Sequence, residues 1–145
     1  MSRYLIIASR FNEMITESLL KGAKDTFLKA GIKEGECLDI VWVPGAFEVP
    51  VIAAKAGRSG RYDAIVALGA VIRGDTPHFD YVAGEAASGL MRVSIETGVP
   101  VIFGILTTDT VEQALNRAGL KHGNKGADAA GTAILMAETI KNLPF

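Results

Sequence analysis

Four short apolar segments are the feature of this sequence that most restricts its fold. Each is rich in valine, isoleucine, leucine or alanine, and none alternates apolar with polar residues; they are Tyr4–Ser9, Leu38–Val43, Ala64–Ile72 and 99–107. Uninterrupted apolar runs of this length are typical of strands that are covered on both faces. The segments therefore predict four parallel strands in the interior of the protein.

Amphipathic helical patterns separate these segments. Between residues 13 and 30 an apolar residue recurs at every fourth position, and Gly31 supplies a stop. Further helices are predicted over residues 47–56, 81–97 and 127–142, and after a cap at Asp109 or Thr110. Alternating strands and helices require right-handed crossovers, which put helices on both faces of the sheet. The expected fold class is α/β, a three-layer flavodoxin-like sandwich with a four-stranded parallel sheet.

The composition indicates a protein with an interface as well as a core. The 145 residues fit one domain, and 49% of them are hydrophobic. The mean hydropathy of +0.28 exceeds what the core of a soluble monomer needs, so contact with other subunits is expected. The net charge is −1, without long runs of either sign, which argues against a nucleic-acid or membrane-surface partner.

The cysteine content and the apolar runs bear on location. Cys37 is the only cysteine, so an internal disulfide is excluded and a buried, inert thiol is expected. No apolar run approaches the roughly 18 residues that a membrane span needs, and residues 1–3 lead directly into the first apolar segment. We therefore expect a cytoplasmic protein.

Polar residues collect where the predicted strands end. The segments that follow the four strands are 10–12, 44–48, 73–80 and 107–109. Ligands of open parallel sheets bind at the carboxyl ends of the strands, so these segments are expected to surround a ligand site.

The third of these segments has two interpretations. Gly74, Asp75 and Thr76 precede a long predicted helix, whose free N–H groups suit a phosphate, but the same residues fit an ordinary turn and cap. Asp75 is compatible with a phosphate only if its carboxylate points away. His78 is either a solvated loop residue or a proton carrier beside that anion site. The other histidine, His122, lies in a connector rich in glycine and lysine and is expected at the surface.

Phe11 and Glu48 also leave two possibilities open. Phe11 follows the first strand between polar residues, where it either covers the core or stacks on a planar heterocycle. Glu48 is either a carboxylate favoured by the helix dipole in a first turn or a ligand contact.

Five ordered motifs resemble the lumazine synthase family along nearly the whole chain. They are RFN at 10–12, VPGAFEVP at 43–50, GAVIRGDTPHFDYV at 69–82, FGILTT at 103–108 and GNKG at 123–126. The resemblance implies one lumazine-synthase-like domain over residues 1–145. It also implies the condensation of 5-amino-6-(D-ribitylamino)uracil with 3,4-dihydroxy-2-butanone 4-phosphate to 6,7-dimethyl-8-ribityllumazine, the penultimate step of riboflavin biosynthesis. This reaction requires no cofactor and no metal.

The resemblance assigns roles to particular residues. It implies that Phe11 stacks on the pyrimidine ring and that His78 transfers protons. The remaining implied contacts are Ala46, Phe47 and Glu48 with the ribityl chain, the backbone of Ala70, Val71 and Ile72 with the ring edge, and Asp75, Thr76 and Arg117 with the phosphate. Phe103 and Arg117 are expected from a neighbouring subunit, and Lys125 matches a basic residue near the pocket.

The resemblance also implies an assembly. A homopentamer is expected, either alone or as part of a shell of sixty subunits, and riboflavin synthase is a candidate partner. Many family members have about ten more residues before the first strand, which add an edge strand to a neighbouring subunit in shells. Here Tyr4 already belongs to the first predicted strand, and this departure concerns assembly rather than catalysis.

Two other functions are possible on the same fold. A flavin-binding electron carrier on the same fold needs a phosphate loop rich in serine and threonine after the first strand, whereas residues 9–13 contain one hydroxyl. A catalytically silent assembly protein has no need to keep the full set of Phe11, Glu48, Thr76, His78 and Arg117.

Overall fold

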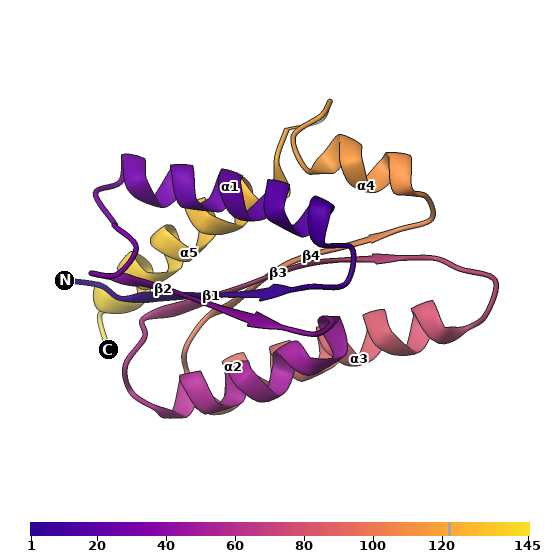
Figure 1. Ribbon diagram of the computed structural model, residues 1–145. Helices are drawn as coiled ribbons and strands as arrows, with labels where there is room; N and C mark the ends of the chain where they lie inside the picture. Colours follow the sequence, from indigo (N-terminus) through magenta and orange to yellow (C-terminus); the bar gives the residue numbers. More distant parts are fainter. Residues whose placement is uncertain (122) are drawn as a thin grey trace.

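The strands form a parallel sheet in the order β2-β1-β3-β4 (Figure 1). The computed structural model describes residues 1–121 and 123–145, so His122 lies outside the described residues. The strands are β1 (Tyr4–Ser9), β2 (Leu38–Val43), β3 (Ala64–Ile72) and β4 (Val101–Thr108). The apolar segments of the sequence predict the first three with these bounds. Because all four run in one direction, their carboxyl ends meet at one edge.

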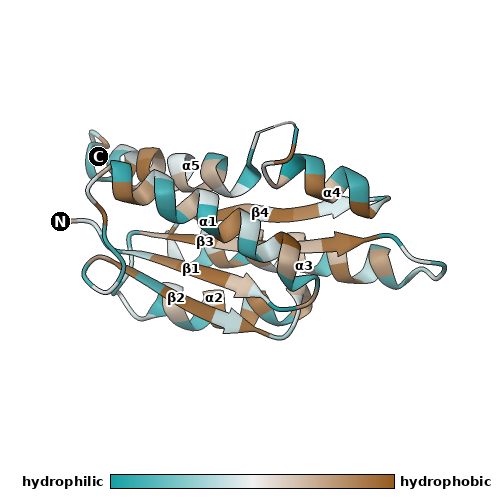
Figure 2. Ribbon diagram, turned by 45° about the horizontal axis from the view of Figure 1, so that its top comes forward, coloured by the Kyte–Doolittle hydropathy of each residue, from teal (hydrophilic) through white to brown (hydrophobic). Residues whose placement is uncertain are grey.

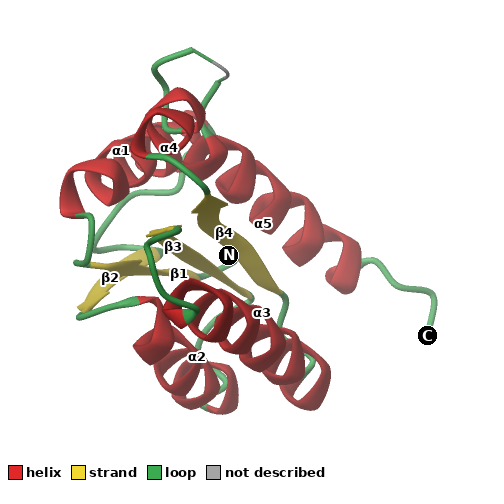
Figure 3. Ribbon diagram, turned by 90° about the vertical axis from the view of Figure 1, so that its right-hand side faces the viewer, coloured by secondary structure: helices red, strands yellow, loops and turns green. Residues whose placement is uncertain are grey.

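Helices cover both faces of the sheet, as Figures 1 and 3 show. One face carries α2 (Val49–Arg58) and α3 (His78–Thr97), and the short 3-10 helix η1 (Ala46–Glu48) leads into α2. The other face carries α1 (Glu13–Lys29) and α5 (Lys125–Lys141), with α4 (Val111–Arg117) close to them. The predicted three-layer, flavodoxin-like α/β fold is therefore confirmed.

The core consists of two apolar clusters, one on each side of the sheet. Neighbouring strand residues alternate between them: Ile6 packs with α1 and α5, and Ile7 packs with α2 and α3. The strands are correspondingly mostly brown in Figure 2, with paler or teal parts in β2 and at the end of β4, whereas the helices alternate brown and teal. The apolar residues predicted at every fourth position of this helix face the core in α1. One of them, Phe27, is fully buried, and its ring centroid lies 5.0 Å from that of Tyr4.

Local chemistry sets the boundaries that the sequence pattern missed. β4 begins at Val101, not at 99, because Pro100 has no N–H to donate to the ladder. α3 begins at His78, not at 81, because Pro77 supplies a helix-compatible φ of −69° and its carbonyl accepts the N–H groups of Asp80 and Tyr81.

The remaining helix ends follow the capping rules. Of the two candidate caps before α4, Thr110 is the one used, in a reciprocal capping box with Gln113. α2 begins at Val49 rather than at 47, because the residues before it form the tighter η1 turn. α5 begins at Lys125 rather than at 127, because the Asn124 side chain caps it.

Two further expectations concern exposure and membranes. Cys37 is buried, as predicted, with its sulfur against that of Met1. Among the described residues, no helix has the length and apolar character needed to cross a membrane.

Candidate active site

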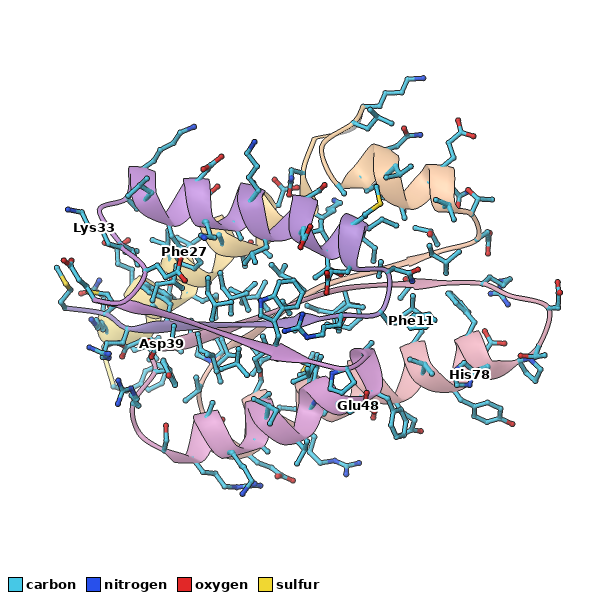
Figure 4. All side chains as sticks on the ribbon, viewed as in Figure 1. Phe11, Phe27, Lys33, Asp39, Glu48 and His78 are labelled. Carbon is cyan, nitrogen blue, oxygen red and sulfur yellow. The ribbon has the colours of Figure 1, made fainter. Side chains whose placement is uncertain are left out.

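A cavity of about 580 Å³ opens at the carboxyl edge of β1, β2 and β3. It is lined by parts of the loops after these strands and by the first turns of α3, as predicted for three of the four segments that follow strands. The fourth segment, 107–109, does not line it, and Thr107 lines a different hollow. Figure 4 shows Phe11, Glu48 and His78 at this end of the sheet. Predicted site residues that line it are Phe11, Ala46, Phe47, Glu48, Ala70, Val71, Ile72, Thr76 and His78.

Phe11 is held at the cavity by its neighbours rather than by its own packing. Asn12 adopts a left-handed conformation with φ 61°, and its Nδ2 donates to the Ala70 carbonyl at 2.9 Å. The Phe11 N–H donates to the Pro44 carbonyl at 3.0 Å. The ring is 73% exposed, so it does not cover the core and is available for stacking.

The loop after β2 brings an aromatic ring and a carboxylate to the cavity. Ala46 is buried, whereas the ring of Phe47 is largely exposed. Glu48 stands at the start of α2, but its side chain makes no cap hydrogen bond. It folds over Gly45, where an added Cβ would lie 3.1 Å from the Glu48 Oε1 atom. The carboxylate is therefore not used in capping.

The Arg73 guanidinium contacts three side chains around the loop after β3. The Arg73 Nε donates to Asp109 at 2.9 Å, and its Nη1 lies 3.5 Å from Asp80. The Arg73 guanidinium also stacks on the ring of Phe79, 4.4 Å from the centroid. The hydrogen bond to Asp109 raises the pKa of Arg73 above its ordinary value. These contacts link Arg73, directly after β3, to Asp80 in α3 and to Asp109 directly after β4.

The segment before α3 keeps both of its interpretations. The Thr76 Oγ1 accepts the N–H of His78 at 3.4 Å, as in an ordinary turn. Gly74, Thr76 and His78 nevertheless line the cavity, where a helix N-terminus favours an anion. Asp75 is exposed and does not line it.

Three further predicted site residues lie in a second depression. Phe103, Arg117 and Lys125 line a hollow of about 370 Å³ formed by β4, α4 and α5. Arg117 ends α4, and Lys125 begins α5, 3.9 Å from Asp128. β4 is an edge strand, and α4 and α5 lie on the face opposite α3 (Figure 3). Apart from Asp75, which lines neither hollow, the predicted site residues therefore form two separate groups on one chain.

Sequence reasoning missed three residues that position these groups. They are Asn12, Arg73 and Asp109. Asn12 could have been found from the sequence, because asparagine tolerates the left-handed region and here stands directly before a helical pattern. The Arg73–Asp109 pair joins residues that are distant in sequence, and only the sheet order brings them together.

The fold and the cavity define a class of protein. The carboxyl edge of this parallel α/β sandwich presents exposed aromatic rings, a carboxylate that makes no cap hydrogen bond, and a helix N-terminus. Such a site is suited to a planar polar ligand and an anionic group. Among the described residues, no group of three or more histidine, cysteine, aspartate or glutamate side chains could hold a metal ion.

Comparison with known families identifies the reaction. The family model described as 6,7-dimethyl-8-ribityllumazine synthase matches residues 1–141. The chain belongs to this family and is a transferase of riboflavin biosynthesis, acting as a lumazine synthase on the small-molecule substrates of that pathway. The expected family and activity are thus confirmed, and the comparison gives no support to an electron carrier or a silent scaffold.

Proposed function

We propose that the active site is shared between two subunits. The cavity that contains Phe11 binds the ribitylamino-pyrimidinedione, and the hollow that contains Arg117 on the next subunit closes over the sugar phosphate. The observation that carries this proposal is the separation of the predicted site residues into two groups on one chain. The larger cavity alone lacks part of the chemistry, because the described residues that line it include no lysine or arginine to pair with a phosphate.

In the proposed complex the pyrimidinedione occupies the larger cavity. Its ring stacks on Phe11, and the backbone of residues 70–72 hydrogen-bonds the ring edge. The ribityl hydroxyls bind along residues 46–48 and donate to the Glu48 carboxylate. The exposed ring and the uncommitted carboxylate support these assignments.

The sugar phosphate occupies the junction between the two hollows. The Thr76 hydroxyl and the N–H groups at the start of α3 bind its phosphate, with the side chain of Asp75 turned away. Arg117 of the neighbouring subunit contributes paired, charge-assisted hydrogen bonds. Phe103 and Lys125 of that neighbour complete the enclosure.

Holding the two substrates together provides most of the acceleration. The amine of the pyrimidinedione adds to the ketone, and loss of water gives an imine. Phosphate then leaves, and the ribityl-bearing nitrogen closes the ring with loss of a second water. An amine and a ketone condense without much help, so alignment is the main contribution of the protein, and His78 moves the protons.

Replacing His78 tests the proton-transfer role. General acid–base catalysis typically contributes about 10²–10⁴-fold, but we expect a loss of about tenfold for His78→Ala because alignment is retained. The measurement is kcat from lumazine fluorescence between pH 6 and 8. Unchanged turnover across that range in His78→Ala would show that His78 carries no essential proton.

The proposed assembly is a pentamer built around α3. Its buried face, with Ala86 and Leu90, packs on its own sheet, whereas Met91 and Ile95 are 62% and 74% exposed. Such exposed apolar residues support contact with a neighbouring subunit. A sixty-subunit shell is the further expectation, favoured by the short GNKG connector, and riboflavin synthase is its candidate cargo.

Light scattering coupled to size exclusion tests the assembly. A pentamer or a shell agrees with a shared site, and the mass distinguishes the two. A monomer that retains full activity would contradict the shared site, because no neighbour would then supply Arg117.

A further inference from the structure

The side chain of Asn124 joins three helices through four hydrogen bonds. Its Oδ1 accepts the N–H groups of Gly126 at 2.8 Å and Ala127 at 3.1 Å, at the start of α5. Its Nδ2 donates to the carbonyl of Ser18 in α1 at 3.0 Å and to that of Ala118 at the end of α4 at 3.2 Å. One amide therefore links the ends of α4 and α5 to the body of α1.

Two glycines make this arrangement sterically possible. A Cβ on Gly22 would lie 2.5 Å from the Asn124 side chain, and a Cβ on Gly126 would overlap the carbonyl oxygen of Leu19. The start of α5 therefore rests directly on the backbone of α1. An amide suits this place because it supplies two N–H donors and an acceptor oxygen in one short side chain.

The linked backbone is adjacent to the proposed phosphate ligands. Ala118 directly follows Arg117, and Asn124 directly precedes Lys125. Ala118 and Asn124 also pair as an isolated antiparallel bridge. Arg117 is exposed at the last turn of α4, so the direction of its guanidinium depends on where that helix ends. The amide of Asn124 fixes that end relative to Lys125.

We propose that Asn124 is a positioning residue for the phosphate-binding half of the active site. It holds Arg117 and Lys125 at a fixed separation on a rigid support, so that both reach the sugar phosphate of the adjoining subunit. This inference rests on the proposed role of Arg117. It concerns one substrate only, because the pyrimidinedione cavity is built from other elements.

The test compares the KM values of the two substrates in Asn124→Asp. The carboxylate retains the helix cap, but it loses both donors and faces the carbonyls of Ser18 and Ala118. We expect KM for the sugar phosphate, and the inhibition constant of inorganic phosphate, to rise about tenfold because the cation is displaced. KM for the pyrimidinedione should change less than twofold.

Two further variants test whether the rise in KM for the sugar phosphate depends on the particular Asn124→Asp substitution. Asn124→Ser retains a cap oxygen without the amide, and Gly22→Ala displaces the amide without changing it. Both should raise KM for the sugar phosphate selectively in the assembled enzyme. Asn142→Asp is the matched control, because its amide donates to the Glu138 carbonyl at the far end of α5, and it should leave both KM values unchanged.

The double variant Arg117→Ala/Asn124→Asp separates this inference from the proposed function. If Asn124 acts through Arg117, the double variant should bind the sugar phosphate about as weakly as Arg117→Ala alone. Additive losses, or a lower melting temperature with both KM values unchanged, would overturn the positioning role while leaving the phosphate role of Arg117 intact. If Arg117→Ala itself leaves KM for the sugar phosphate unchanged, the proposed site fails and this inference fails with it.

Discussion

Arg117→Ala is expected to lower kcat/KM for the sugar phosphate by about 10²-fold, because removal of one preorganised donor to a charged oxygen typically costs that much. KM for the pyrimidinedione should stay close to that of the parent. Arg117→Lys should restore activity only in part, since an ammonium lacks the paired geometry of the guanidinium. The measurement is steady-state formation of the fluorescent lumazine with each substrate varied in turn.

A second arginine provides the control for this prediction. Arg58 is exposed on α2 and lies 3.5 Å from Glu96, away from both hollows. Arg58→Ala should retain parental kinetics, since exposed ion pairs contribute little. If Arg117→Ala behaves in the same way as Arg58→Ala, Arg117 is only a solvent-facing helical residue.

Gly126→Ala is expected to destabilise the fold by about 3 kcal/mol, at the upper end of the usual cost of overpacking. The new methyl group would overlap the Leu19 carbonyl oxygen, and neither backbone segment can move without disturbing the α1–α5 contact. Urea unfolding measures the decrease in the free energy of unfolding. The protein concentration must be the same for each variant, because association also stabilises a folded subunit.

Gly131→Ala is the matched control in the same helix. A Cβ at Gly131 meets nothing within 4 Å, and α5 is helical on both sides of it. This variant should be neutral or more stable by up to about 1 kcal/mol, since alanine favours a helix over glycine. Equal stability of Gly126→Ala and Gly131→Ala would contradict the close approach of α5 to α1.

The fold could be predicted because burial leaves a plain pattern in the strands. Strands covered on both faces are almost entirely apolar, as β1 and β3 are, and β1, β2 and β3 were predicted with their observed bounds. The expected interior position is wrong for β2, an edge strand that contains Asp39 and a 38% exposed Val41. β4 was predicted to start too early, because Val99 and Pro100 continue the apolar run although proline cannot donate to the ladder. The start of α5 was missed because the Asn124 cap is formed by a side chain that also contacts α1 and α4.

The position of the candidate site could be predicted more fully than the contacts that hold its residues in place. Parallel strands bring the segments after them to one edge, which located the cavity before any residue was assigned a role. The contacts of Asn12 and Arg73 depend on which strands are neighbours in the sheet. The local sequence pattern does not reveal the order of the strands. The roles of Phe103 and Arg117 came from the resemblance alone, because these residues do not meet Phe11 within one subunit.

The shared active site is tested most directly by mixing two inactive subunits. Glu48→Ala damages the cavity, and Arg117→Ala damages the hollow that serves the neighbouring subunit. In a ring with head-to-tail contacts, random equimolar mixing should leave about a quarter of the sites with both halves intact. We therefore predict clear recovery of lumazine formation in verified mixed oligomers, compared with either variant alone. Mixed oligomers with no more activity than the two separate variants would contradict a site shared between subunits.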